Sequence, residues 1–188
     1  MSQPNPSDKN ATVTSFTQLE PPPPAMLNAP LNFISAQHLC QRSLCALLRD
    51  IARSRRVRRA VADKVLAFLT HDLVQHHQDE EVDLFPALRK RADPEDGLAA
   101  ILARLSIDHR EFDCLVAEIV AALSAKPVRD WIAIPPQAAE PLLAYASLER
   151  RHLSVENGIV LVIARKCLPP ADLRALSRSM KQRRGMEF

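Results

Sequence analysis

The residues of this chain best suited to chemistry are histidines and glutamates that interrupt the apolar faces of helix-like segments. Two pairs have the spacing His-x-x-x-Glu, namely His77 with Glu81 and His152 with Glu156. Residues four apart lie on one face of a helix. A carboxylate on a core face is costly without a compensating charge, which a metal ion supplies. Imidazole and carboxylate together suit iron, zinc or manganese, so the pattern predicts a metal site.

Two further histidines interrupt the apolar faces of the other long segments, His38 in the first and His109 in the third. The segments are joined by turns centred near residues 57, 93 and 131, and each of the four histidines lies about 15 to 17 residues from a segment end. At a rise of about 1.5 Å per residue, all four fall at one level of a helical bundle. The register therefore predicts one shared site for these histidines and the two glutamates.

The second segment contains an alternative frame, in which His76 precedes Glu80 by four residues. We favour His77 and Glu81 because their face continues to apolar residues. The positions that follow are Leu84 and Leu88 for the face of His77, and Asp83 and Ala87 for the face of His76. In this interpretation, His76 and His71 lie outward or at the periphery.

Helical periodicity dominates the chain, and strand-type alternation is hard to find. Apolar-periodic segments cover residues 31–54, 59–92, 98–125 and 137–168, with breaks at Asp93-Pro94-Glu95-Asp96-Gly97 and at Pro169-Pro170. Four long helices with short connections predict an all-α fold, an up-down-up-down four-helix bundle over residues 31–168. Residues 169–188 form a basic tail with a short helix over residues 172–184. Residues 1–30 contain Pro21-Pro22-Pro23-Pro24 and many polar residues, which predicts a flexible, disordered proline-rich arm.

The composition suits one domain of ordinary size, with 188 residues, 47% of them apolar and 25% charged. A net charge of +3 is too small an excess to indicate a nucleic-acid partner. No apolar run approaches the roughly 20 residues that a membrane span needs. Residues 1–30 contain no secretory apolar stretch, and the cysteines suit reduced thiols, so we expect a cytoplasmic protein. The four cysteines are Cys40, Cys45, Cys114 and Cys167.

The order of these motifs resembles the hemerythrin-like, or HHE cation-binding, family over residues 31–168. The family's pattern is a lone histidine, His-x-x-x-Glu, a second lone histidine and a second His-x-x-x-Glu. In this chain the pattern is met by His38, His77 with Glu81, His109, and His152 with Glu156. The stretch Glu81-Val82-Asp83-Leu84-Phe85-Pro86 is similar to the family's Glu-x-x-Leu-Phe-Pro signature. The resemblance implies a di-iron centre, two irons bridged by Glu81, Glu156 and a solvent-derived oxygen. Its terminal ligands are then His38, His77, His109 and His152.

One position departs from the oxygen-carrying members of that family, which have another histidine one turn after the third-helix histidine. Here that residue is Asp113. Its side chain has three possible roles: it binds a metal, it accepts a hydrogen bond from a metal ligand, or it points to solvent. A missing imidazole leaves one iron more open and favours redox, nitric oxide or peroxide chemistry over reversible oxygen carriage. Tyr145 and Cys45 lie near the predicted site, and we interpret both as core packing.

The leading hypothesis is a non-haem di-iron protein that binds or reduces a small ligand in sensing or stress protection. That ligand is oxygen, nitric oxide or a peroxide, and the pattern does not decide between binding and turnover. One alternative is a protein of iron homeostasis or iron–sulfur repair that donates its irons. Another is a zinc-bound or metal-free helical module whose proline-rich arm binds a protein partner. A hydrolase ranks last, since no Ser-His-Asp pattern or phosphate-binding glycine loop is visible.

Overall fold

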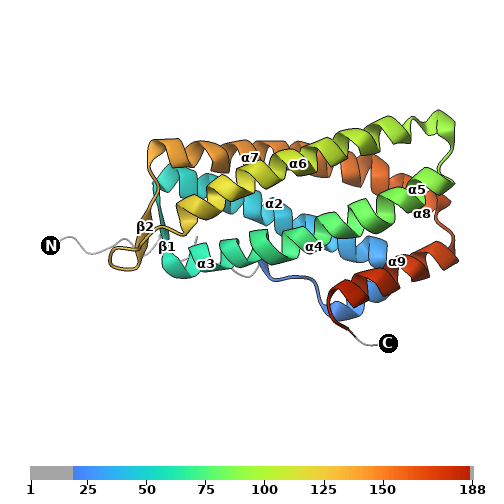
Figure 1. Ribbon diagram of the computed structural model, residues 1–188, viewed down its shortest axis with the longest axis horizontal. Coiled ribbons are helices and arrows are strands. Elements are labelled where there is room, and N and C mark those ends of the chain that lie inside the picture. The colour runs from blue at the N-terminus through green and yellow to red at the C-terminus, as the bar shows by residue number, and fades with distance from the viewer. Residues whose placement is uncertain (1–18, 187–188) are drawn as a thin grey trace.

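The computed structural model describes residues 19–186. Its long helices run alternately up and down and pack side by side along one axis (Figure 1). The first is α2 (Pro30–Ser54) and the third is α6 (Leu98–Leu123). The all-α four-helix bundle predicted from the sequence is confirmed.

The second long helix contains two π-helical turns, in which each hydrogen-bonded ring holds one residue more than in an α-helix. It runs through α3 (Arg59–Ala67), the π turn η3 (Phe68–Asp72), α4 (Leu73–Gln78), the π turn η4 (Asp79–Leu84) and α5 (Phe85–Arg91). The extra residue changes which side chains face the core after each turn.

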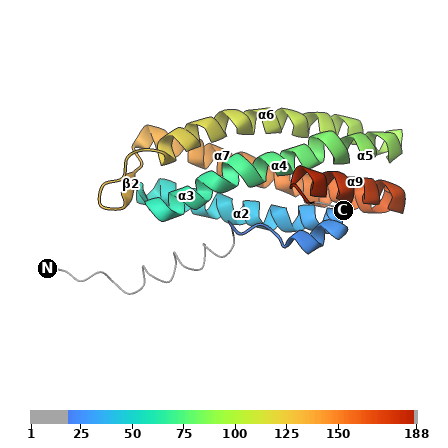
Figure 2. The ribbon, with the colours of Figure 1, turned by 60° about the horizontal axis from the view of Figure 1, so that its bottom comes forward.

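The fourth long helix has the same construction with one π turn. It consists of α7 (Pro136–Val155), the π turn η6 (Glu156–Val160) and α8 (Leu161–Cys167). Pro169 and Pro170 then redirect the chain, and Pro170 begins α9 (Pro170–Arg183), where its missing N–H costs no hydrogen bond. Figure 2 shows α9 lying along the outside of the bundle, over α2 and the π turn η4.

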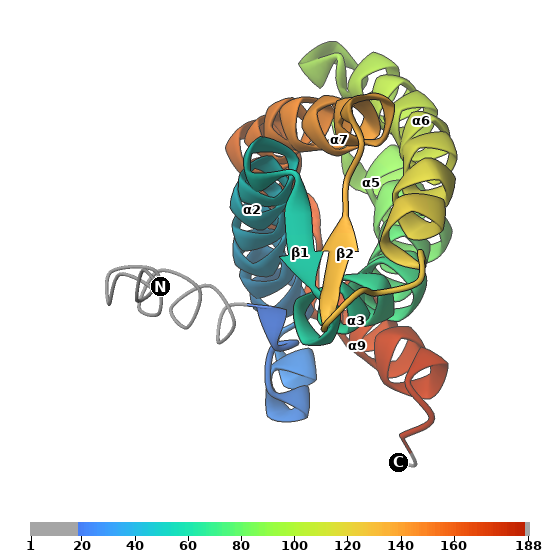
Figure 3. The same cartoon turned by 90° about the vertical axis from the view of Figure 1, so that its left-hand side faces the viewer.

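A short antiparallel ribbon closes one end of the bundle, which the sequence did not predict. It pairs β1 (Arg56–Arg58) with β2 (Trp131–Ala133), and Val57 lies opposite Ile132 with both side chains buried (Figure 3). The guanidinium carbons of Arg56 and Arg58 lie 4.5 Å and 4.9 Å from the ring centre of Trp131. Strands of three residues are too short for alternation to be recognised in a sequence.

The core consists of two apolar clusters at different levels of the bundle. On α2 the cluster nearer the ribbon includes Leu44 and Leu48, whereas the other includes Phe33 and Ile34. Each of the other long helices is divided in the same way, for example α6 between Phe112 and Leu105. Buried polar residues occupy the level between the clusters, where the sequence register placed the four histidines.

Residues 19–30 pack against the bundle rather than extending away from it. Leu27, in the 3-10 turn η2 (Pro24–Asn28), is fully buried in the same cluster as Met180 of α9. The Cys40 thiol also donates a hydrogen bond to the carbonyl of Glu20. The predicted flexible arm otherwise falls on residues 1–18, which lie outside the described residues.

None of the described helices is long and apolar enough to cross a membrane.

Leu48 and Leu39 provide a matched test of this packing on α2. The Leu48 side chain is fully buried, whereas that of Leu39 is 61% exposed. Leu48→Ala is expected to lower the free energy of unfolding by about 2–5 kcal/mol, because it leaves a cavity in the core. Leu39→Ala should change it by about 0.5 kcal/mol or less. Urea unfolding followed by circular dichroism measures both, and equal losses would contradict the helix orientation.

Candidate metal centre

Six buried ionisable side chains converge between the two apolar clusters. They come from all four long helices, and none is more than 5% exposed. They are His38 from α2, His76 and Glu80 from the second helix, His109 from α6, and His152 and Glu156 from the fourth helix. Their ligand atoms form two groups, each within the span of a single metal ion.

The first group joins His38 and His76 to the two glutamates. His38 Nε2 lies 3.3 Å from Glu156 Oε2 and 3.6 Å from Glu80 Oε1. His76 Nε2 lies 3.5 Å from the same Glu80 oxygen. These ligand atoms all lie within 4.8 Å of one another. One cation between them can therefore contact two imidazoles and two carboxylates.

The second group joins His109 and His152 to the other oxygens of the same glutamates. His109 Nε2 lies 3.4 Å from Glu80 Oε2, and His152 Nε2 lies 3.1 Å from Glu156 Oε1. The two Nε2 atoms are 3.2 Å apart. Glu80 and Glu156 thus each direct one oxygen to each group. This is the arrangement that two bridging carboxylates require in a centre of two metal ions.

The hydrogen bonding supports a cation at this position. Both ring nitrogens of His38, both carboxylate oxygens of Glu156 and Oε2 of Glu80 are buried without a hydrogen bond. Buried polar atoms are nearly always satisfied, and an unpaired buried carboxylate is especially costly. A metal ion satisfies imidazole nitrogens and carboxylate oxygens together, so the donor set fits a metal.

Two of the histidines are oriented by a carboxylate at Nδ1, the ring nitrogen that faces away from the centre. His109 Nδ1 donates to Glu81 Oε1 at 2.7 Å, and Ser106 Oγ donates to the other Glu81 oxygen at 2.9 Å. His152 Nδ1 donates to Asp108 Oδ2 at 3.4 Å. Such contacts fix the tautomer, so that Nε2 keeps the lone pair that binds a metal.

The two groups differ in these outer contacts. His76 Nδ1 faces a neutral partner, Gln37 Oε1, at 3.2 Å, whereas His109 and His152 face carboxylates. A carboxylate partner makes an imidazole a stronger base and a stronger ligand. The two groups would therefore donate electrons unequally to a bound metal.

Four of the six predicted residues belong to these groups: His38, His109, His152 and Glu156. The structure does not bring His77 and Glu81 into either group. The His77 ring stacks on that of His109, with centroids 4.2 Å apart, and the Glu81 side chain is 34% exposed and bonded to His109. The structure instead brings His76 and Glu80, the alternative frame, into the candidate groups, and the prediction that His76 lies at the periphery is wrong.

The π turn η4 explains this difference. The apolar residues Leu84 and Leu88 are fully buried, as the sequence predicted, but they follow the turn. Counting back from them at α-helical spacing reaches Glu81 and His77. The extra residue of the turn moves the inward face by one position, to Glu80 and His76. The same shift follows Glu156. Val160, four residues after Glu156, is 1% exposed, whereas Ile159, three residues after it, is 38% exposed.

The three residues with open roles are also located. Asp113 is exposed and belongs to neither metal group. Tyr145 is fully buried, and its ring packs on Phe112 with a centroid distance of 5.3 Å. Cys45 is 1% exposed, and burial raises the pKa of its thiol to about 12. Packing is the role that these positions support for Tyr145 and Cys45.

Glu149 is a buried carboxyl group that the sequence reasoning missed. It lies three residues before His152 and is 1% exposed, with Oε2 unpartnered. Burial raises its pKa to about 7, partly offset by the positive charge of His152. The sequence could have indicated that Glu149 lies near the site, because residues three apart share a helix face and Glu149 precedes His152 by three.

The charges of the metal-free site are set by burial and by the glutamates. Burial opposes protonation of His109, but the negative charge of Glu80 and the hydrogen bond to Glu81 outweigh it and raise its pKa to about 10. Burial also opposes protonation of His152, but the charge of Glu156 outweighs this effect and raises the pKa of His152 to about 9. Burial and the repulsion of His38 hold the pKa of His76 well below its usual value.

Comparison with known families agrees with the geometry. The model of the hemerythrin HHE cation-binding domain matches residues 29–164. The chain belongs to the hemerythrin HHE cation-binding family. No curated protein matches the chain. The family match covers the first three long helices and the fourth as far as residue 164, within α8, whereas α9 of this hemerythrin-family protein lies beyond it.

Glu80 and Glu81 give a direct test of the alternative frame. Glu80→Gln is expected to abolish binding of a second metal ion and greatly weaken the first, because both of its oxygens face the centre. Glu81→Gln should retain two ions with an affinity lower by about 10–100-fold, because it only orients His109. Metal content per chain and competition with a chelator measure the difference. Greater damage from Glu81→Gln would restore the original frame.

The raised histidine pKa values predict proton release on metal binding. At pH 7 the metal-free protein carries protons on His109 and His152, whose pKa values are about 10 and 9. Coordination requires neutral imidazoles, so filling the centre should release about two protons, and apparent affinity should rise with pH up to about 9–10. Calorimetry in buffers of different ionisation enthalpy measures the release. A pH-independent affinity between pH 6 and 9 would contradict it.

Proposed function

We propose that this protein is a non-haem di-iron protein that binds or reduces a small ligand. The observation that carries the proposal is the sharing of Glu80 and Glu156 between two histidine groups, with one oxygen of each glutamate in each group. A single-metal site needs only one such group. Two metal ions are therefore the occupancy that this donor set supports best.

The choice of iron follows from the ligand chemistry and the family. Mixed imidazole and carboxylate ligands suit iron, zinc or manganese, and the resemblance to di-iron members of the family favours iron among them. The six side chains supply about eight donor positions if both glutamates bridge, against about twelve for two six-coordinate irons. The positions left over are what chemistry with a small molecule requires. A bound iron pair supplies redox chemistry and a place for that molecule to coordinate.

The chain itself limits the ligand to a small one. The six side chains are at most 5% exposed. The rings of Phe85 and Phe112 flank the histidines, with Phe85 stacked 5.9 Å from His109 and Phe112 edge-on 5.2 Å from His152. Such surroundings exclude bulk water and larger substrates. Oxygen, nitric oxide and peroxide have the size that this burial allows.

We place this chemistry in sensing or stress protection, in the cytoplasm. Asp113, which stands where oxygen carriers have a further histidine, is exposed and outside both groups. This supports redox, nitric oxide or peroxide chemistry rather than reversible oxygen carriage. A protein partner that binds the N-terminal arm is part of the same proposal, with no role for nucleic acid or membrane.

Metal analysis tests the proposal directly. Protein purified without added metals should contain about two irons per chain and show near-ultraviolet absorption of a coupled ferric pair. The spectrum should change on exposure of the reduced protein to oxygen, nitric oxide or peroxide. Glu80→Gln, which removes a shared carboxylate, should contain less than one iron per chain and show neither the coupled-pair absorption nor the change.

The opposing outcomes are equally specific. Zinc alone, or folded protein that takes up no iron on reconstitution, would remove the redox role and favour a helical interaction module. Rapid transfer of the irons to an acceptor protein, without a response to the small ligands, would instead favour iron donation.

A further inference from the structure

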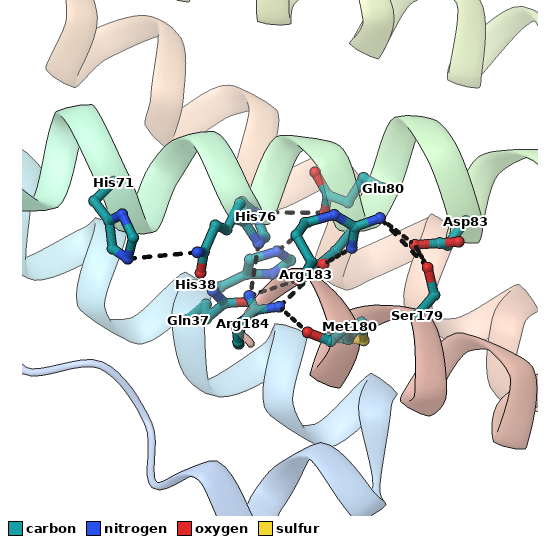
Figure 4. A network of polar contacts seen from close by, with 12 residues as sticks. Gln37, His38, His71, His76, Glu80, Asp83, Ser179, Met180, Arg183 and Arg184 are labelled. Carbon is teal, nitrogen blue, oxygen red and sulfur yellow. Dashed lines mark hydrogen bonds and ion pairs between the residues drawn. The ribbon is translucent and has the colours of Figure 1, made fainter. Parts of the chain in front are cut away.

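The terminal helix α9 makes its most buried polar contacts with the π turn that carries Glu80. Figure 4 shows Ser179 and Arg183 of α9, and Arg184 directly after its end, reaching toward the helix that carries His76, Glu80 and Asp83. Asp79, at the start of the turn, has a fully buried carboxylate. It lies immediately before Glu80 in the chain, so a contact to Asp79 acts directly on the backbone that carries the shared glutamate.

Two arginines hold this carboxylate. Arg184 donates to both Asp79 oxygens, from Nη2 at 2.7 Å and from Nη1 at 3.2 Å. Arg183 Nη1 donates to Asp79 Oδ1 as well. A guanidinium that binds both oxygens of a carboxylate fixes its direction as well as its charge. Asp79 is thereby held in one orientation.

Arg183 also binds a second carboxylate, that of Asp83, at the other end of the π turn. Arg183 Nη2 donates to Asp83 Oδ2 at 2.7 Å, and Ser179 Oγ donates to the same oxygen at 2.9 Å. Arg183 therefore spans the turn from Asp79 to Asp83. A π turn is less favourable than the α-helix on either side of it, so its geometry needs support from outside the helix.

Arg184 also connects the turn to α2, the helix of His38. Its guanidinium carbon lies 4.9 Å from the centre of the Phe33 ring. The Arg183 and Arg184 side chains are only 15% and 14% exposed, which strengthens their ion pairs relative to surface pairs. We call these contacts of Ser179, Arg183 and Arg184 with Asp79, Asp83 and Phe33 the α9 clamp.

We propose that the α9 clamp positions Glu80 as a shared metal ligand, so that retention of the metal pair depends on the terminal helix. Asp79, Arg183 and Arg184 are positioning residues, which act through Glu80. The proposal rests on the proposed function only in requiring a metal centre, and it holds for any small ligand. Because α9 lies outside the family match, which ends at residue 164, the family assignment by itself does not imply the clamp.

The full-length protein loaded with Co²⁺ provides the test, because its visible absorption reports ligand geometry. Asp79→Asn preserves the shape of the side chain and removes its charge. It is expected to speed loss of Co²⁺ to excess chelator by about 10–100-fold, the usual effect of losing an outer contact to a ligand, and to alter the absorption bands. Arg184→Ala should act in the same direction from the other side of the clamp.

Asp172→Asn is the matched control. Asp172 binds Arg91 with an Oδ2–Nε distance of 2.7 Å, so it attaches the opposite end of α9 to α5, away from the π turn. This variant should change the rate of Co²⁺ loss by about twofold or less, within the effect of an exposed pair. Equal rates in Asp79→Asn, Arg184→Ala and Asp172→Asn, or an unchanged spectrum in the first two, would overturn the proposal.

Hydrogen exchange of the metal-free protein supplies a second measurement that needs no metal. Asp79→Asn should speed exchange of the amides of residues 79–84, whereas Asp172→Asn should not. Wild-type protein that binds neither Co²⁺ nor iron would refute the proposed function, while the exchange result would still decide whether the clamp holds the turn. Unchanged exchange in Asp79→Asn would overturn the clamp even if the centre binds metal.

Discussion

The burial of two carboxylates at one level of a helical bundle is the constraint on which this structure depends. Glu80 and Glu156 are each 1% exposed and face four histidines between two apolar clusters. Such an arrangement is unfavourable unless positive charge occupies the space between the groups. In the metal-free protein protons on His109 and His152 supply that charge, and the donor set suits a metal pair that replaces them.

The helices meet this constraint through π turns that begin at or beside the glutamates. Asp79–Leu84 and Glu156–Val160 each insert one residue after a His-x-x-x-Glu pair. The insertion lets the histidine and glutamate face the centre while the following segment returns its apolar face to the core. Function and packing therefore make different demands on the same helix, and a local change of pitch reconciles them. π turns are frequent at functional sites for this kind of reason.

Contacts outside the six converging residues differentiate the two halves of the centre. Carboxylates of Glu81 and Asp108 support His109 and His152, whereas the amide of Gln37 supports His76. The α9 clamp lies on the Glu80 side, where its arginines contact the first and second helices. The six converging residues are thus nearly symmetric, but the residues that contact them are not. Such differences in outer contacts allow a protein to give two similar metal ions different properties.

Local pattern in the sequence was sufficient to predict the helices, their connections and four residues of the site, because helical periodicity and distance from the turns are properties of one chain segment. His38, His109, His152 and Glu156 were predicted in this way, and the structure brings them together in the candidate centre. The choice of His76 and Glu80 over His77 and Glu81 was decided only by the tertiary structure. A π turn is a small change in hydrogen bonding with no strong sequence signal, and here contacts from α9, about one hundred residues away along the chain, hold it in place.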